Sequence, residues 1–351
     1  MNVLSPAELR RRHVILAIWL FIVIAMVFAM VVLGGVTRLT HSGLSMVEWK
    51  PVTGWLPPLN EAAWMEVFEK YKLSPEFQKV NKHMELDGFK SIFWFEFLHR
   101  LWGRIIGLAF FLPFMFFLIR GWVSRDMTPK LILMFILGGL QGLMGWYMVK
   151  SGLVDRPDVS QYRLTAHFSL ALIIIGYVEW FALGLLFPRH PENAGATPLK
   201  GFALFVWFWS FITALSGGFV AGLDAGFAYN TFPLMDGAFF PPGLYQLSPV
   251  YLNLFEDITS VQFNHRLLAE GLFVLVAILW LKTRKADLAP RARLAVNCLG
   301  GVVLIQLGLG ISTLLLVIPV PLAAAHQAGA VVVFIIALWT VNEFFRADKR
   351  K

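Results

Sequence analysis

Hydrophobic and polar residues occur in long separate blocks along this chain. Apolar runs lie at residues 14–36, 92–119, 130–149, 163–187, 200–221, 259–281, 294–317 and 321–345. Each run approaches or exceeds the roughly 20 residues that a helix needs to cross a bilayer. The pattern therefore predicts an all-α polytopic membrane protein with eight transmembrane helices.

Composition and the distribution of charge agree with this class. Of the 351 residues, 58% are hydrophobic and 15% are charged, which excludes an ordinary water-soluble globular protein. The formal charge is +8, and Lys and Arg gather at residues 10–12, 120–130, 189–200, 282–293 and 346–351. The positive-inside rule places these loops and both termini in the cytoplasm. We expect a bacterial inner membrane, with membrane lipid as the partner of the basic loops and no nucleic acid.

The two halves of the chain carry similar motifs in the same order. The pairs are Gly34-Gly35 and Gly217-Gly218, His99-Arg100 and His265-Arg266, Gln141 to Gly145 and Gln306 to Gly310, and Ala166-His167 and Ala325-His326. A linker rich in proline and glycine separates the copies, so we expect an N-terminal half at 1–190 and a C-terminal half at 191–351. An even number of spans gives both copies the same orientation. The repeat predicts two pseudo-symmetric four-helix bundles.

Four histidines lie at similar depth near one end of four different predicted spans. They are His99, His167, His265 and His326. In each half two imidazoles approach from facing helices, which suits the two axial positions of a haem iron. A zinc or copper site needs a third ligand; Glu96 offers one in the first half, but Gln262 replaces it in the second. Haem fits both halves, and histidines with only a structural role remain the alternative.

The run from Trp94 to Arg104 places ionisable groups inside an apolar segment. Glu96 and His99 are three residues apart and share a helix face. We expect Glu96 to take part in chemistry in the first half; a salt bridge to Arg100 at i+4 is the alternative. Gly103, one turn beyond His99, is expected to leave a shallow surface for a flat ligand.

In each half, one arginine directly follows the first histidine. Arg100 and Arg266 are expected to pair with haem propionates, because a guanidinium binds a carboxylate through two hydrogen bonds. Contact with lipid headgroups is the alternative.

The longest polar loop, at residues 41–91, faces the side opposite the basic loops. Its segment 61–72 is expected to form a short amphipathic helix, either lying on the membrane or closing over the site as a lid.

With these motifs in place, the chain resembles the haem A synthase family, in its proteobacterial and mitochondrial branch. The matching motifs are Gly34 to Gly43, Glu96 to Arg100, Thr165 to His167, Asn264 to Arg266 and Ala325 to Gln327. The resemblance implies oxidation of the C8 methyl group of haem O to a formyl group by successive hydroxylations, giving haem A for terminal oxidases. Some members carry a cysteine pair in the first outer loop, and this sequence has none there.

The resemblance also implies roles for individual residues. Glu96 would be catalytic, His99, His167 and Arg100 would bind the substrate haem O, and His265, His326 and Arg266 would bind a haem b. A haem O synthase is expected as donor, together with an electron acceptor that the sequence does not identify; a homo-oligomer stays open. The rival function is a di-haem b-type cytochrome that passes electrons to or from quinone. A protein that only carries electrons has little use for an acidic residue at position 96.

Overall fold

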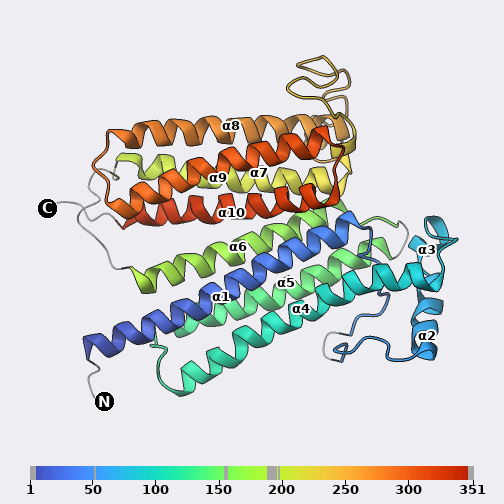
Figure 1. Ribbon diagram of the computed structural model, residues 1–351, viewed down its shortest axis with the longest axis horizontal. Coiled ribbons are helices and arrows are strands. Elements are labelled where there is room, and N and C mark those ends of the chain that lie inside the picture. Colours follow the sequence, from blue (N-terminus) through green and yellow to red (C-terminus); the bar gives the residue numbers. More distant parts are fainter. Residues whose placement is uncertain (1–4, 51–52, 154–156, 188–195, 197, 347–351) are drawn as a thin grey trace. The chain divides into compact units, whose positions relative to one another are not determined.

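In the computed structural model, residues 5–50, 53–153, 157–187, 196 and 198–346 are described. Over these residues the protein is helical, with ten α-helices, two 3-10 helices and no strand (Figure 1). Seven of the described helices are long and apolar enough to cross a membrane: α1 Pro6–Leu39, α4 Leu86–Ile119, α5 Thr128–Gly152, α6 Gln161–Leu186, α7 Lys200–Gly222, α9 Pro290–Leu315 and α10 Val320–Phe345. The prediction of an all-α multi-pass membrane protein is therefore confirmed.

The predicted span at 259–281 corresponds to α8, Ile258–Arg284. Its 27 residues are enough to cross a bilayer, yet α8 is not among the seven helices that meet the length and apolarity criteria. Arg266 and Glu270 lie inside it and Lys282 lies near its end, so ionisable groups interrupt its apolar stretch. The number eight for the membrane spans stays a prediction.

Contacts group the chain into two compact units. One is Met26–Ala171; the other combines Met1–Ala25 with Leu172–Lys351. The predicted boundary at 190/191 lies within residues 188–195, which are outside the described part of the chain. The division into two repeated halves stays a prediction.

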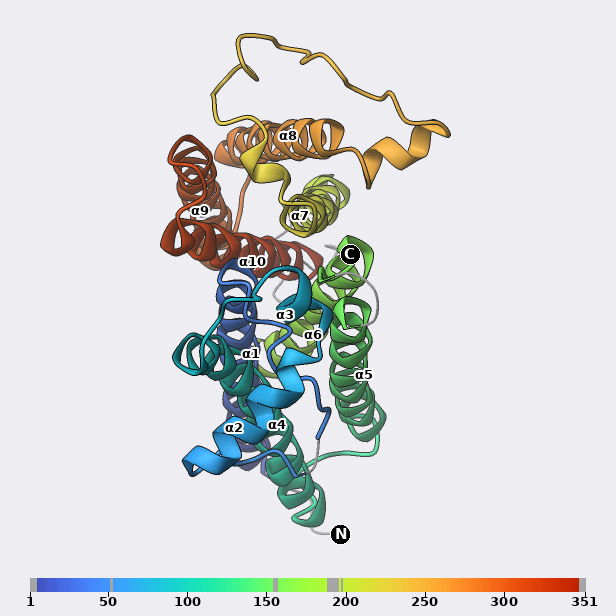
Figure 2. The same ribbon diagram turned by 90° about the vertical axis from the view of Figure 1, so that its right-hand side faces the viewer.

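Helices α7 to α10 pack together within the second unit. α7 lies against α8 and α10, and α9 lies against the same two helices, as Figure 2 shows in a view along their axes. The core between them is aliphatic and aromatic, with Leu279, Leu299 and Phe344 almost completely buried. This packing fixes the relative positions of side chains on α7, α8, α9 and α10.

In the first unit, a short pair of helices packs on α4. The predicted helix at 61–72 is confirmed as α2, Glu61–Lys72, and α3, Pro75–Lys79, follows it. Phe68 and Tyr71 of α2 pack against Phe89 and Phe93 in the first turns of α4. The choice between a lid and a helix lying on the membrane stays a prediction. α2 thus lies against the beginning of α4 (Figure 1), and an aromatic cluster joins the two helices.

Candidate functional site

Each of the four candidate ligand histidines lies against a glycine of the long helix that precedes its own. A Cβ atom built on Gly34 would lie 2.8 Å from Cε1 of His99, and one built on Gly145 would lie 3.1 Å from Cε1 of His167. In the second unit, a Cβ atom built on Gly217 would lie 3.2 Å from Cε1 of His265, and one built on Gly310 would lie 2.8 Å from Cε1 of His326. Real Cβ atoms essentially never approach below 3.0 Å. These glycines therefore create the space in which the imidazole rings lie.

The sequence analysis identified these glycines as repeats but did not assign them to the histidines. The signal was available, because Gly34-Gly35 recurs as Gly217-Gly218 in matching positions. Gly103, which was expected to leave a surface beside His99, has another neighbour. A Cβ atom there would meet the terminal methyl group of Met30 at 3.1 Å, so the expectation is wrong and Gly103 allows α1 to approach α4.

In the second unit, His265 of α8 and His326 of α10 face each other. Their ring centroids are 6.4 Å apart and their planes are inclined by 86°. Since a metal–nitrogen bond is about 2 Å long, this separation leaves room for one metal ion between two facing ring nitrogens. The spacing fits a pair of axial haem ligands.

The Nδ1 atoms of this pair have protein partners. Ser216 Oγ lies 2.7 Å from His265 Nδ1, and Gln306 Nε2 lies 3.1 Å from His326 Nδ1. Gln306 also donates to the backbone carbonyl of His326 at 2.9 Å. Histidines that bind metals usually donate a hydrogen bond from the nitrogen that faces away from the metal, as His265 can to Ser216, whereas Gln306 Nε2 is itself a donor, so His326 Nδ1 accepts there.

In the first unit, His99 lies on α4 and His167 lies on α6. Gln141 donates to the backbone carbonyl of His167 at 3.1 Å, and its Nε2 lies 3.4 Å from His167 Nε2. The Nδ1 atoms of both histidines are buried and have no hydrogen-bond partner among the described residues. This pair offers the same two ligands as the second unit, with fewer contacts to fix the rings.

Glu96 is buried, with 3% of its surface exposed, and several groups donate to it. Ser45 Oγ and the backbone nitrogen of Met46 each donate to Oε2 at 2.7 Å, and Arg100 forms an ion pair with Oε1. The ion pair that the sequence left as an alternative is therefore present. Ser45 was missed by the sequence analysis, and nothing in its local pattern marks it.

Arg100 and Arg266 make parallel contacts in the two units. Each guanidinium donates to two backbone carbonyls of the loop that precedes its helix. The acceptors are Met46 and Glu48 for Arg100 and Tyr229 and Thr231 for Arg266, each at 2.8 Å. Both arginines thus tie a loop to the helix that carries the neighbouring histidine. Their expected pairing with propionates stays a prediction, and Nε of Arg266 is still buried without a partner in the described residues.

The donor sets suit haem better than an isolated metal ion. Among the described residues, no three or more His, Cys, Asp or Glu side chains are placed to hold a metal ion. Haem iron needs only two axial ligands from the protein, and each unit supplies two histidines beside glycines that leave space for the rings.

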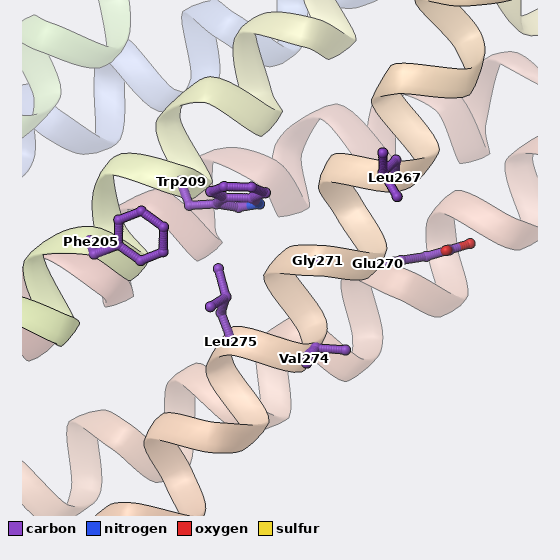
Figure 3. Close-up of a pocket in the computed structure, with 7 residues that line it drawn as sticks. All are labelled: Phe205, Trp209, Leu267, Glu270, Gly271, Val274 and Leu275. Carbon is purple, nitrogen blue, oxygen red and sulfur yellow. The ribbon is translucent and has the colours of Figure 1, made fainter.

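A separate hollow between α7 and α8 does not belong to this site. Figure 3 shows it lined by Phe205, Trp209, Leu267, Glu270, Gly271, Val274 and Leu275. None of these residues is a candidate ligand or one of the glycines beside the histidines. The hollow therefore adds nothing to the ligand set.

Known proteins resemble this chain over nearly its full length. The family described as cytochrome oxidase assembly protein, COX15-CtaA, matches residues 17–338. The heme A synthase of Nitrosospira multiformis is 56% identical over 333 residues, which cover 94% of each chain. Heme A synthase COX15 of Arabidopsis thaliana is 46% identical over 92% of this chain and 72% of its own length. Heme A synthase COX15 of Homo sapiens is 43% identical over 94% of this chain and 83% of its own length.

Proposed function

We propose that this chain, which belongs to the cytochrome oxidase assembly family COX15-CtaA, is a membrane oxidoreductase that converts haem O to haem A. The reaction oxidises the C8 methyl group of haem O to a formyl group. Relatives named heme A synthase match nearly the whole chain in bacteria, plants and mammals. These matches do not favour the alternative of a di-haem cytochrome b that exchanges electrons with quinone.

One observation supports different tasks for the two histidine pairs. Glu96 lies three residues before His99, and Gln262 occupies the corresponding position before His265. Only the first pair has a charged acceptor beside it. We assign the substrate haem O to His99 and His167, and a resident haem b to His265 and His326. Bound haem b would supply an iron centre that accepts and passes on single electrons.

The residues around Glu96 define what its carboxylate can do. Three donors, from Ser45, Met46 and Arg100, fix its position one helical turn from His99. A carboxylate held in this way stays charged and can accept a hydrogen bond from water or from a hydroxyl group on the substrate. We therefore assign Glu96 as the catalytic residue.

We further propose that α8 is the eighth membrane span. Its packing against both α7 and α9 supports this, because a helix in that position shares the environment of its two neighbours. The chain would then form two pseudo-symmetric four-helix bundles, α1, α4, α5 and α6 in one and α7 to α10 in the other. The distribution of Lys and Arg favours a bacterial inner membrane with both termini in the cytoplasm.

The proposal also requires a supply of substrate and a path for electrons. Haem O would come from a haem O synthase in the same membrane. Electrons from the oxidised methyl group would pass to an electron acceptor. Anionic lipid would contact the basic cytoplasmic loops.

Pigment analysis tests the function directly. The chain would be expressed in a bacterial host whose membranes contain haem O but no haem A, and the extracted haems would be separated by chromatography. Haem A should appear only when the chain is expressed, and the purified protein should contain haem b. Membranes without haem A, together with a purified protein without haem b, would contradict the proposal.

A further inference from the structure

His99 and His265 occupy matching positions in the two repeats. Measured from a Cβ atom added to Gly34, Cε1, Nδ1 and Nε2 of His99 lie at 2.8, 3.4 and 3.9 Å. Measured from Gly217, the same atoms of His265 lie at 3.2, 3.8 and 3.9 Å. The order is identical, so the same edge of each ring faces its glycine. The two Nδ1 atoms therefore occupy equivalent places.

The partners of these two nitrogens differ. Ser216 Oγ lies 2.7 Å from His265 Nδ1 and donates its single hydroxyl proton to the carbonyl of Thr213 at 2.7 Å. With the hydroxyl proton on that carbonyl, the oxygen accepts from the tautomer of His265 that carries Nδ1–H, in which Nε2 is unprotonated and able to bind iron. His99 Nδ1 is buried and has no partner among the described residues.

The sequence explains this difference at a single position. Ser216 directly precedes Gly217-Gly218, and Leu33 directly precedes Gly34-Gly35. An aliphatic side chain offers no acceptor, so the position that holds the imidazole in one repeat cannot hold it in the other. A hydrogen bond of this kind fixes the tautomer and plane of a ligand histidine, and its loss typically weakens metal affinity 10- to 100-fold.

We propose that Ser216 is a positioning residue that makes His265 a permanent haem ligand, and that Leu33 leaves His99 able to release its haem. The residue before each glycine pair thus decides which half retains its haem and which half exchanges it. A synthase must release each product molecule, whereas a resident cofactor must stay bound. This inference rests on the proposed function and assigns the two behaviours to one side chain in each half.

The first experiment measures haem release after changes at Ser216. Purified Ser216→Ala, Ser216→Thr and wild-type proteins are mixed with excess apomyoglobin, and the transfer of haem b is followed by absorbance. Ser216→Ala should lose haem b about 10 to 100 times faster than the wild type. Ser216→Thr should retain it, because the hydroxyl group is kept. An unchanged release rate in Ser216→Ala would overturn the proposal.

A matched control lies on the same helix. Ser210 of α7 is buried and donates to the carbonyl three residues before it at 2.6 Å, as Ser216 does, but it has no contact with a histidine in the hydrogen bonds of the described residues. Ser210→Ala should release haem b at the wild-type rate. Faster release from this variant as well would mean that loss of any hydroxyl group from α7 loosens the bundle, and would also overturn the assigned role.

The reciprocal change gives His99 the missing partner. Leu33→Ser should retain haem O or haem A through purification, whereas Leu33→Ala, of similar size but without a hydroxyl group, should not. Equal haem contents in these two variants would contradict the role of position 33. Failure of the proposed function is distinguishable, because a wild-type protein that contains no haem b would refute the function before any variant is compared.

Discussion

Gln262 on α8 takes the place that Glu96 has on α4. Oε1 of Glu96 accepts from Nη2 of Arg100, and Oε1 of Gln262 accepts from Nη2 of Arg266 at 3.4 Å. Both arginines then reach two carbonyls of the preceding loop. The repeats thus share one scaffold, and at this position they differ by a single negative charge.

This relationship defines a test of Glu96. Glu96→Gln copies the second repeat and leaves the contacts of Arg100 with the loop carbonyls in place, although one amide oxygen cannot accept from Ser45, Met46 and Arg100 together; the protein should fold with its haem b. Loss of the carboxylate should lower haem A yield by about 10²-fold or more and cause haem O, or a partly oxidised haem, to accumulate. Extraction and chromatography of the haems measure this. A wild-type yield of haem A from Glu96→Gln would remove Glu96 from the chemistry.

The second histidine pair should account for the haem b spectrum. His265→Ala and His326→Ala each remove one of two facing ligands, so the low-spin haem b absorbance of the purified protein should be lost. His99→Ala should leave that absorbance in place, because His99 belongs to the other unit. Full haem b absorbance in both His265→Ala and His326→Ala would refute the assignment.

Two glycines on α9 give a matched test of the space beside the imidazoles. A Cβ atom at Gly310 would lie 2.8 Å from Cε1 of His326, whereas one at Gly308 would meet nothing within 4 Å. Alanine favours a helix over glycine at both positions by up to ~1 kcal/mol. Gly310→Ala should nevertheless reduce the low-spin haem b signal, and Gly308→Ala should not. Equal spectra for the two variants would contradict the role of Gly310.

Substitutions of Arg266 distinguish two roles of its side chain: holding the preceding loop and binding a haem propionate. Its guanidinium reaches two carbonyls at once, which the single ammonium group of lysine does not reproduce. Arg266→Ala and Arg266→Lys should therefore both speed hydrogen exchange at residues 229–231, with about 2 kcal/mol lost from local stability. Haem retention should be measured in parallel. If Arg266→Lys retains haem better than Arg266→Ala while hydrogen exchange rises equally in both variants, attraction between the positive charge at position 266 and the propionates is the main contribution of this residue to haem binding.

The raised pKa of Glu76 predicts how the free energy of unfolding depends on pH. Burial raises the pKa of this carboxyl to about 7 from its ordinary value of 4.5, although Tyr71 donates to it at 3.0 Å. The charges of Glu96 and Asp158 also raise it. The folded protein therefore holds the proton more tightly than the unfolded chain. The free energy of unfolding should fall between pH 4.5 and 7, by about 1 to 3 kcal/mol in total, and this decrease should stop above pH 7.

Glu76→Gln tests this dependence. The variant should be no less stable than the wild type at pH 5 and more stable at pH 8, because it has no proton to lose. Hydrogen exchange of α2 and α3 at the two pH values reports the difference. A stability difference that does not change with pH would show that Glu76 keeps its ordinary pKa.

Much of the fold follows from the sequence, because the thickness of the bilayer sets the length of apolar helices. The run predicted at 130–149 became α5, Thr128–Gly152, and the run at 200–221 became α7, Lys200–Gly222. The repeat also predicted that His265 and His326 approach each other, and their rings do face each other. Helix length and periodicity are local properties, so one sequence is enough to reveal them.

The contacts that hold Glu96 and His265 in place were decided by tertiary structure alone. Ser45 reaches Glu96 from 51 positions away, and Ser216 reaches His265 from 49 positions away. Ser45 lies in a loop whose backbone no hydrophobic period predicts, and the bond from Ser216 depends on how α7 is rotated against α8. The sequence predicted which histidines form each pair, whereas packing between distant segments determined which ring nitrogen is held and which is left without a partner among the described residues.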